Sequence, residues 1–353
     1  MLQLDNVLPS PTRLPDVPGN KGQLAVLESL PAIESAVLQR RPLTLFRGAT
    51  GCGKSKYLPE RYADMLSELA DFENKLLVLT YAAKDVEDMH RHCSIASHWR
   101  TGGKKSGGCA WIDARIIFST IGLCFRWYAS DGINALNDFD AVVLDEIGAV
   151  ERNMDYSFIF ELMQENQRRR MSENRMFPIF MCTATMSDRL SETMRKLRPD
   201  IIECPKRPYL LERYQVEIDT FDAMYKTMAA CAKELLESGR TGLMFLPGEK
   251  ETEKMKTILI NLGVAADVIF PLFGDLDPQA IKDALTPRPY PRIILATSLA
   301  ELAMTIPDVD VVLDSGVGRF TSDDEVPSSF DYLISATSSK QREGRAGRAK
   351  RGC

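Results

Sequence analysis

The residues from Gly48 to Ser55 combine glycines, a lysine and a hydroxyl at a spacing suited to phosphate. They read GATGCGKS and match the pattern GxxxxGK[ST] between an apolar strand and an amphipathic helical segment. Glycines let backbone N–H groups curl around phosphate oxygens, and the helix N-terminus adds a favourable dipole. The pattern therefore predicts a nucleotide phosphate site in which Lys54 reaches the β- and γ-phosphates and Ser55 ligates Mg²⁺. The loop residues expected to contact the nucleotide are Gly48, Ala49, Thr50, Gly51, Cys52, Gly53, Lys54 and Ser55.

Two adjacent acids follow a second buried apolar run, Phe139–Glu146, which reads FDAVVLDE. Asp145 at the end of this strand can hold the Mg²⁺ shell, and Glu146 can polarise the attacking water. Many strands end in Asp or Glu at a turn without any catalytic role. The pair points to catalysis because it accompanies the phosphate loop.

Basic residues crowd the C-terminus, where Glu343 is the only acid among six cations, Lys340, Arg342, Arg345, Arg348, Lys350 and Arg351. A solvated charged tail is one interpretation of such a run. The other interpretation starts from the spacing of Arg345 and Arg348, since residues three apart lie on one helical face. Both side chains could then point at a γ-phosphate held by another domain. Hydrolysis would in that case depend on domain closure, because an arginine that stabilises phosphoryl-transfer charge contributes several kcal/mol.

These residues must be positioned by an α/β framework, because short apolar runs alternate with longer amphipathic stretches. The runs are apolar on both faces, as parallel strands covered by helices must be. The strands expected before Cys204 are 43–46, 76–79, 116–118, 142–144 and 179–182, with helices at 56–69 and 85–96. The rhythm restarts with a helix at 224–237 and strands at 242–246, 268–272, 292–296 and 309–313. This is the βαβ order of doubly wound sheets in two domains.

The segment 198–207, with prolines in and beside it, is the expected linker. We therefore expect an irregular N-terminal lead-in over 1–21, a first domain over 22–205 and a second over 206–353. The chain has 353 residues, which is long enough for two domains with separate cores. No apolar stretch approaches a membrane span, and the N-terminus does not have the pattern of a signal peptide.

Eight cysteines are scattered without a CxxC pair, which indicates free thiols in a reducing compartment. The formal net charge of −5 does not exclude a nucleic acid partner, because cations need only line one groove. The three histidines and Cys93 lie close together, but their spacing matches no common zinc finger, and a solvated helix is the alternative.

Several motifs occur in an order that resembles superfamily 2 helicases of the DEAH type and the viral DExH type. They are GATGCGKS, DEIG at 145–148, TAT at 183–185, ATSLAELAMTI at 296–306 and QREGRAGR at 341–348. FRGATGCGKSKYLP, FDAVVLDE and QREGRAGRAKRG are most similar to the cylindrical-inclusion helicase of potyviruses and to hypovirus helicases. The resemblance spans about residues 22–353.

The resemblance implies two tandem RecA-like domains, each a mostly parallel doubly wound sheet, with the nucleotide cleft between them. It implies that RNA stimulates the hydrolysis of ATP or another NTP with Mg²⁺. The hydrolysis would drive 3′-to-5′ movement on single-stranded RNA and the unwinding of duplexes that carry a single-stranded tail. It further implies a part in viral RNA replication in host cytoplasm, at replication membranes reached through viral replication proteins. The third domain of such relatives is expected to be absent.

The family motifs also imply roles for individual residues at the matching positions. Gln341 would position the attacking water, and Arg345 and Arg348 would act as arginine fingers. Thr305 would contact the nucleotide, and Thr183 and Thr185 would link the two domains. The residues implied to contact the RNA backbone are Lys84, Thr120, Gly122 and Thr297, and such contacts are largely independent of sequence.

The sequence departs from the family pattern at Gly148, where the family usually has a histidine that couples hydrolysis to the second domain. Lys84 is assigned only by position, because its motif lacks the usual Pro and Arg. An RNA-clamping NTPase that does not unwind processively is therefore an alternative, and an unrelated P-loop phosphotransferase is a second one. Residues 314–335 form either a strand-splitting β-hairpin or a connecting loop with an acidic tip.

Overall fold

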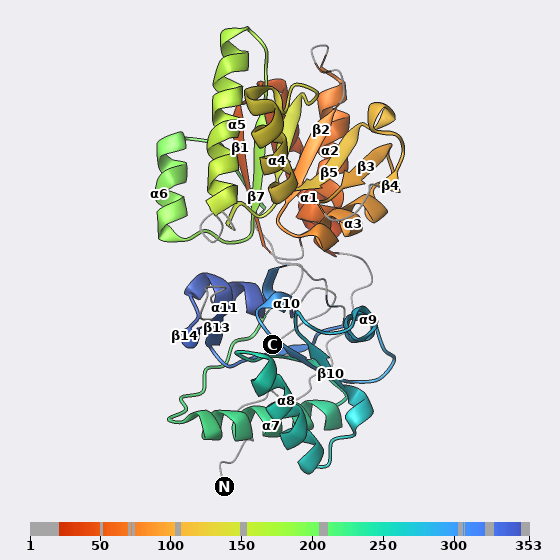
Figure 1. Ribbon diagram of the computed structural model, residues 1–353, viewed down its shortest axis with the longest axis vertical. Coiled ribbons are helices and arrows are strands. Elements are labelled where there is room, and N and C mark those ends of the chain that lie inside the picture. The colour runs from red at the N-terminus through yellow and green to blue at the C-terminus, as the bar shows by residue number, and fades with distance from the viewer. Residues whose placement is uncertain are drawn as a thin grey trace. The chain divides into compact units, whose positions relative to one another are not determined.

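The protein is described by a computed structural model that covers residues 21–49, 52–69, 72, 75–102, 107–148, 154–204, 211–302, 306, 308–321 and 328–346 (Figure 1). It divides into two compact units. One contains Gly22–Arg207, and the other contains Pro208–Glu301 and Thr305–Cys353. Each is an α/β unit with its own parallel sheet, as the sequence predicted.

The sheet of the first unit has the strand order β4-β3-β5-β2-β6-β7-β1-β8. All neighbouring strands are parallel except the short pair β3 and β4. The strands are β1 (Leu43–Gly48), β2 (Leu76–Thr80), β3 (Ser97–Arg100), β4 (Gly107–Gly108), β5 (Ile116–Thr120), β6 (Ala141–Leu144), β7 (Ile179–Thr183) and β8 (Asp200–Cys204). The five strands expected from apolar runs are all present, and they occupy the interior of the sheet.

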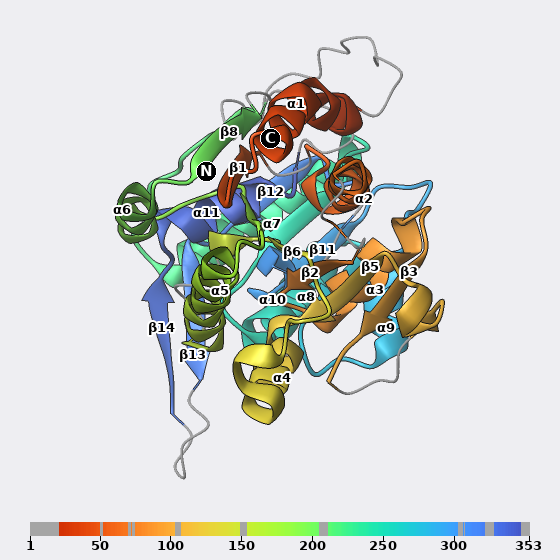
Figure 2. The ribbon, with the colours of Figure 1, turned by 90° about the horizontal axis from the view of Figure 1, so that it is seen from above.

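Helices cover both faces of this sheet because its inner strands are apolar on both sides. Phe46 packs with helices α1, α2 and α3, whereas its neighbour Leu45 packs with α4, α5 and α6 on the opposite face. Figure 2 shows α1 and α2 on one side and α4 and α5 on the other. The bounds are α1 (Lys21–Leu38), α2 (Lys54–Ser67), α3 (Ala83–His92), α4 (Ile121–Asp131), α5 (Met154–Ser172) and α6 (Asp188–Leu197).

Two local expectations in this unit were wrong. The proposed linker contains β8, which pairs in parallel with β1 at the edge of the sheet. Its alternate residues Ile202 and Cys204 are buried, so the segment has the period-two pattern of a half-covered strand. The helix expected to end at residue 96 ends at His92, because Ser97 begins strand β3.

The sheet of the second unit has the order β10-β11-β9-β12, and every pair is parallel. Helices α7 and α8 pack on one face through a core that includes Met228, Leu235 and Met255. The bounds are α7 (Phe221–Glu237), β9 (Gly242–Phe245), α8 (Glu249–Asn261), β10 (Ile269–Leu272), α9 (Pro278–Leu285), β11 (Ile293–Ala296), α10 (Leu299–Leu302), β12 (Val311–Asp314), β13 (Val317–Thr321), β14 (Ser329–Leu333) and α11 (Ala336–Glu343). Strands β13 and β14 form an antiparallel hairpin, which confirms the hairpin geometry, whereas its role in strand splitting stays a prediction.

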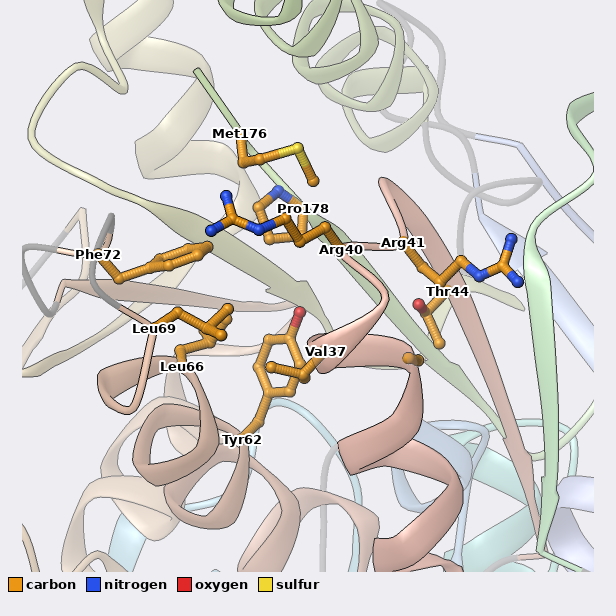
Figure 3. A pocket seen from close by; sticks show the side chains of 11 residues that line it. Val37, Arg40, Arg41, Thr44, Tyr62, Leu66, Leu69, Phe72, Met176 and Pro178 are labelled. Atoms are coloured by element: carbon orange, nitrogen blue, oxygen red, sulfur yellow. The ribbon is translucent and has the colours of Figure 1, made fainter. Parts of the chain in front are cut away.

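A small apolar cavity lies at the end of the first sheet where β1 begins, between the last turns of α1 and α2 (Figure 3). Val37, Tyr62, Leu66 and Phe72 are among its lining residues. It encloses about 10 Å³, which is room for roughly one water molecule. It is therefore a packing gap rather than a nucleotide site. None of the helices in the described ranges combines the length and apolarity that crossing a membrane would require.

Candidate nucleotide-binding site

The phosphate loop connects the carboxyl end of β1 to the first turn of α2. Gly53 adopts φ 96°, a left-handed conformation that glycine tolerates without strain, and α2 begins at the next residue. The Lys54 ammonium is buried and donates to the carbonyl oxygen of Gly48 at 2.8 Å and of Ala49 at 3.3 Å. The loop carbonyls thus hold the cation where phosphate oxygens would compete for it. Thr50 and Gly51 lie outside the described residues.

Ser55 and Asp145 meet although they are far apart in the sequence. The Ser55 hydroxyl donates to Oδ2 of Asp145 at 2.8 Å. The contact arises because β6 lies beside β7 and β7 beside β1, so that their carboxyl ends share one edge of the sheet. Hydroxyl and carboxylate oxygens are the ligands that Mg²⁺ prefers, and Mg²⁺ usually takes one or two carboxylates together with phosphate oxygens. These two residues therefore fit the predicted metal site.

The charged side chains of the site change the pKa values of Lys54 and Asp145. Burial would by itself lower the pKa of Lys54, but Cys52, Glu146 and Asp145 raise it above its usual value. Burial and the neighbouring Glu146 raise the pKa of Asp145 to about 6, against the opposing effects of Ser55 and Lys54. Lys54 therefore stays charged at neutral pH, because its raised pKa lies above its usual value.

Glu146 is held by the residues that end β7. Its backbone has φ 57°, a left-handed conformation that is uncommon for a residue with a side chain. Its Oε1 lies 2.9 Å from the Thr183 hydroxyl and 3.4 Å from the Ala184 N–H. The same Thr183 hydroxyl lies 2.6 Å from the carbonyl oxygen of Thr185. Because a hydroxyl has a single proton, Thr183 can donate to Glu146 or to Thr185, but not to both at once.

Gly148 packs against these three residues without space for a side chain. A Cβ at this position would lie 2.9 Å from the Thr185 carbonyl oxygen and 3.3 Å from both Glu146 Oε1 and Thr183 Oγ1. Side chains essentially never approach backbone oxygen that closely. The packing at this position therefore requires glycine.

The residues expected to contact RNA in the first unit lie at the same edge of its sheet as the phosphate loop. The register pairs Thr80 with Thr120, so the ends of β2 and β5 are adjacent. Lys84 follows β2 in the first turn of α3, half-buried, and its burial lowers its pKa. Thr120 caps α4 by accepting the Leu123 N–H at 3.4 Å. Gly122 is exposed, with open space where a Cβ would stand.

The second unit holds the other predicted residues. Thr297 follows β11, and its N–H donates to the Leu272 carbonyl oxygen at 3.2 Å. Gln341 lies in α11 and is 7% exposed, and its Oε1 has no partner among the described residues. Thr305 and Arg348 fall outside the described residues.

Arg345 is not part of a helix, which corrects one sequence expectation. Helix α11 ends at Glu343, and Arg345 stands in the turn that follows Gly344. The helical-face argument for Arg345 and Arg348 is therefore wrong at Arg345, because the glycine-rich sequence favours a helix end there. The buried guanidinium of Arg345 donates to the carbonyl oxygen of Glu301.

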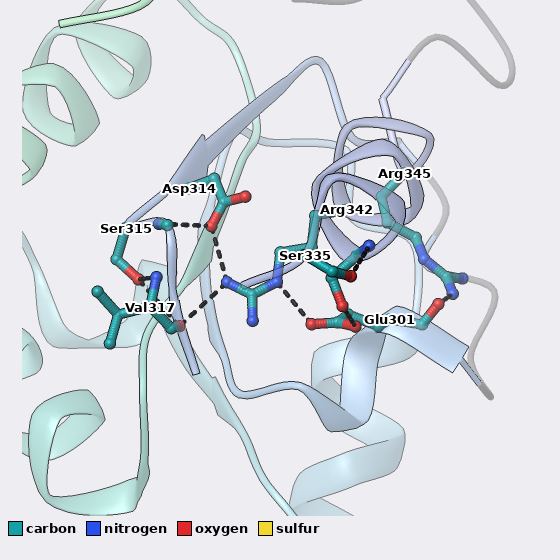
Figure 4. A network of polar contacts seen from close by, with 9 residues as sticks. Glu301, Asp314, Ser315, Val317, Ser335, Arg342 and Arg345 are labelled. Atoms are coloured by element: carbon teal, nitrogen blue, oxygen red, sulfur yellow. Dashed lines mark hydrogen bonds and ion pairs between the residues drawn. The ribbon is translucent and has the colours of Figure 1, made fainter. Parts of the chain in front are cut away.

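Arg342 is a buried residue to which the motifs assigned no role. It is 1% exposed, and its guanidinium donates to Glu301 Oε1 at 2.6 Å and to Asp314 Oδ1 at 2.7 Å (Figure 4). Its guanidinium carbon also lies 4.9 Å from the centre of the Phe245 ring. The Ser338 hydroxyl donates to the other carboxylate oxygen of Glu301 at 2.9 Å. Arg342 thus ties α11 to α10 and to the end of β12. Its presence inside QREGRAGR was the available signal.

Comparisons with known proteins agree with this geometry. Residues 226–350 match the family "Helicase conserved C-terminal domain". ATP-dependent RNA helicase TDRD9 of Mus musculus is 24% identical over 410 residues, covering 100% of this chain and 28% of that protein. ATP-dependent RNA helicase HrpB of Escherichia coli is 27% identical over 342 residues, covering 93% of this chain and 40% of that protein. The chain thus spans well under half the length of these relatives.

The crystal structure of the Escherichia coli DEAH/RHA helicase HrpB superposes with a TM-score of 0.73 at 23% identity. The match covers 93% of this chain and 42% of that one, and at this identity it establishes the fold. The relatives named here are bacterial and animal proteins, and they give no support to the viral branch of the expectation. Residues 226–350 thus match a helicase domain, and nearly the whole chain is similar to part of proteins named ATP-dependent RNA helicases.

Proposed function

We propose that this chain is the motor core of an RNA helicase that hydrolyses ATP or another NTP with Mg²⁺ to move along single-stranded RNA. The observation that carries the proposal is the 2.8 Å contact between Ser55 and Asp145. It joins the two oxygen ligands that a nucleotide-bound Mg²⁺ would need. The naming of the relatives as ATP-dependent RNA helicases supports RNA as the polymer.

In this proposal each residue of the first unit has a defined task. Lys54 leaves the loop carbonyls and binds the β- and γ-phosphates, and Ser55 and Asp145 hold Mg²⁺, which would neutralise charge on the phosphates. Glu146 accepts a proton from the attacking water, and its contact with Thr183 orients the carboxylate. Thr183 and Thr185 pass a change at Glu146 to the rest of the protein, since the Thr183 proton can switch between two acceptors.

The second unit supplies groups that respond to the nucleotide. We assign Gln341 to the attacking water because its amide oxygen is buried and has no partner among the described residues. Arg345 and Arg348 would stabilise charge on the transferred phosphoryl group, and Thr305 would contact the nucleotide. The units around residues 22–205 and 206–353 would then act as the two helicase domains.

RNA would bind through its phosphates, across the residues Lys84, Thr120, Gly122 and Thr297. The N–H groups in the first turn of α4 support this assignment, because helix N-termini bind anions. Beyond its own helix and chain neighbours, no atom of the described residues lies within 4 Å of the place where a Cβ of Gly122 would stand, so a phosphate could approach there. The viral replication setting and the host cytoplasm remain predictions from the motif resemblance, and no similarity to the relatives above supports them.

ATP hydrolysis with and without single-stranded RNA tests the proposal. RNA should raise the rate of the unaltered chain, and Lys54→Ala should abolish hydrolysis while Lys56→Ala, a neighbouring exposed lysine, should not. Hydrolysis that does not respond to RNA would favour an unrelated phosphotransferase.

A clamping NTPase is a second candidate because Gly148 replaces the residue that usually couples hydrolysis to the other domain. Displacement of a labelled strand from a duplex with a 3′ single-stranded tail separates the two candidates. Strong RNA-stimulated hydrolysis without displacement would establish the clamp.

A further inference from the structure

Two cysteines meet at the base of the phosphate loop. Cys52 belongs to the loop, and Cys204 is the last residue of β8. The parallel register pairs Gly48 with Cys204, so β8 ends beside the point where the chain leaves β1 to enter the loop. Both side chains are buried, Cys52 at 0% and Cys204 at 5% exposure, and both are free thiols.

The two side chains border one small volume above Gly48. A Cβ at Gly48 would lie 2.7 Å from the sulfur of Cys52 and 3.4 Å from the Cβ of Cys204. The Cys204 thiol donates to the carbonyl oxygen of Ala25 at 3.3 Å. Both side chains therefore reach the same small space beside Gly48.

We propose that Cys52 and Cys204 form a reversible disulfide under a two-electron oxidant of the peroxide class, and that this bond locks the phosphate loop and stops nucleotide hydrolysis. The inhibitory part rests on the proposed function, whereas the bond itself does not. Nothing in the helicase motifs requires Cys204, which lies outside all of them.

The chemistry balances without a further reagent. One thiol loses its proton and attacks the O–O bond of hydrogen peroxide, which gives a sulfenic acid and, with that proton, one water. The second thiol attacks the sulfenic sulfur and releases the second water. Two S–H bonds are broken and one S–S bond is formed, while the peroxide is reduced by two electrons.

The position of the bond explains its expected effect. Cys52 stands two residues before Lys54, and the loop between β1 and α2 must wrap around the phosphates when nucleotide binds. A sulfur–sulfur bond is about 2.05 Å long and fixes the dihedral angles of both side chains. It would pin Cys52 to β8, which pairs with β1 along the edge of the sheet. The loop would then be unable to rearrange.

The surroundings also predict when the bond forms. The hydrogen bond to Cys204 and burial raise the pKa of the Cys52 thiol well above its usual range. Because the thiolate is the reacting species, the pair should resist oxidation more than an exposed cysteine does. The Cys52–Cys204 disulfide would therefore form only under strongly oxidising conditions, and a reducing compartment would keep both cysteines as thiols.

The test compares the full chain with Cys204→Ser and with Cys124→Ser, which removes a buried thiol on the opposite face of the same sheet. Each protein is treated with hydrogen peroxide and digested without reductant, and peptides are identified by mass spectrometry. Nucleotide affinity and ATP hydrolysis are measured in parallel, before and after dithiothreitol.

We expect a peptide pair joined through Cys52 and Cys204 in the unaltered chain and in Cys124→Ser, together with at least a tenfold loss of hydrolysis that dithiothreitol reverses. Cys204→Ser should keep its activity under the same treatment. If that variant does not fold, Cys204→Ala serves the same purpose. Equal loss in the Cys204 variant, or no joined peptide, would overturn the proposal. A joined peptide in a chain that never hydrolysed ATP would instead count against the proposed function.

Discussion

Gly148 has no room for a side chain. The space around it is filled by the Thr185 carbonyl, Glu146 and Thr183. A larger residue would push the backbone at Thr185 away from Glu146. The glycine is thus required by the packing of this site.

We predict that Gly148→Ala lowers stability by about 1–2 kcal/mol, as overpacking of a close-packed site usually does. It should also lower kcat, because Glu146 must move with its neighbours. Urea unfolding followed by tryptophan emission measures the stability, since the three tryptophans, Trp99, Trp111 and Trp127, all belong to the first unit.

Gly122→Ala provides the matched control for this stability measurement, because its Cβ would meet open space at the start of α4. Alanine in a helix should leave stability unchanged or raise it slightly. If both alanine variants have the same free energy of unfolding, the close contacts around Gly148 do not prevent a side chain at that position.

Asp145 should make the nucleotide-free protein lose stability as pH rises. Its pKa is about 6 in the folded protein, against 3.8 for an ordinary aspartate. Between these values the folded state binds more protons than the unfolded state, so the stabilisation present at low pH is lost as pH approaches the folded pKa. The free energy of unfolding should therefore fall between about pH 4 and pH 6 relative to Asp145→Asn, which cannot titrate there.

Tryptophan-detected urea unfolding across that pH window, without Mg²⁺ or nucleotide, checks the prediction. Other carboxylates titrate in the same range, and the Asn variant controls for them because it leaves them unchanged. Parallel pH curves for the two proteins would show that Asp145 has an ordinary pKa.

At the scale of elements, the buried Arg342 joins α10, β12 and α11. Removing one partner of a buried ion pair leaves an uncompensated charge and typically costs about 3–5 kcal/mol. We therefore predict that Arg342→Met destabilises the second unit strongly, because the Glu301 side chain, at 5% exposure, loses its arginine partner. The double variant Arg342→Met with Glu301→Leu should recover a large part of the loss.

Hydrogen exchange followed by mass spectrometry can locate this loss in peptides from β12 and α11. Arg213→Ala is the control, because its ion pair with Glu343 is exposed on the arginine side and should contribute at most about 1 kcal/mol. Unchanged exchange in Arg342→Met would mean that helix packing alone holds α11.

The sequence predicted the elements whose apolar pattern is strong and missed those whose pattern is mixed. Strands β1, β2, β5, β6 and β7 are continuous apolar runs, so their burial on both faces could be read directly. The edge strand β8 carries Asp200 and Glu203 beside prolines, and it looked like a linker. Its pairing with β1 depends on a partner distant in sequence, which a local pattern does not reveal.

Some residues of the candidate site could be located from the sequence, and others could not. The phosphate loop and the paired acids could be assigned from motifs, because each role follows from residue type and neighbouring elements. The contact of Arg342 with Glu301 and the approach of Cys52 and Cys204 to Gly48 could not, because they join segments that meet only after folding. Arg345 shows a third case, since its position after the end of α11 depends on where the helix stops.

At the scale of the whole molecule, the proposed motor requires that groups on separate units act on one nucleotide. Lys54 belongs to one compact unit and Arg345 to the other. Nucleotide binding should then need mainly the first unit, whereas hydrolysis should need both. A substitution in the second unit should therefore lower hydrolysis without lowering nucleotide affinity. A phosphotransferase with its whole active site in one unit would not show this separation.

We predict that Arg345→Ala in the full chain leaves the Kd for a fluorescent ATP analogue within a few-fold but lowers kcat by roughly 10³-fold or more, as loss of an arginine finger does. The measured quantities are analogue binding by anisotropy and RNA-stimulated hydrolysis. Arg345 also donates to the Glu301 carbonyl oxygen, so a structural role must be separated from a catalytic one.

Arg345→Lys provides this separation, because it keeps a cation that can reach the carbonyl oxygen and lacks the planar guanidinium. Hydrogen exchange in α11 should therefore stay normal in this variant while kcat remains low. Disturbed exchange with kcat lowered only in proportion to the unfolded fraction would show that Arg345 merely supports α10, and hydrolysis would then need a different cation from the second unit.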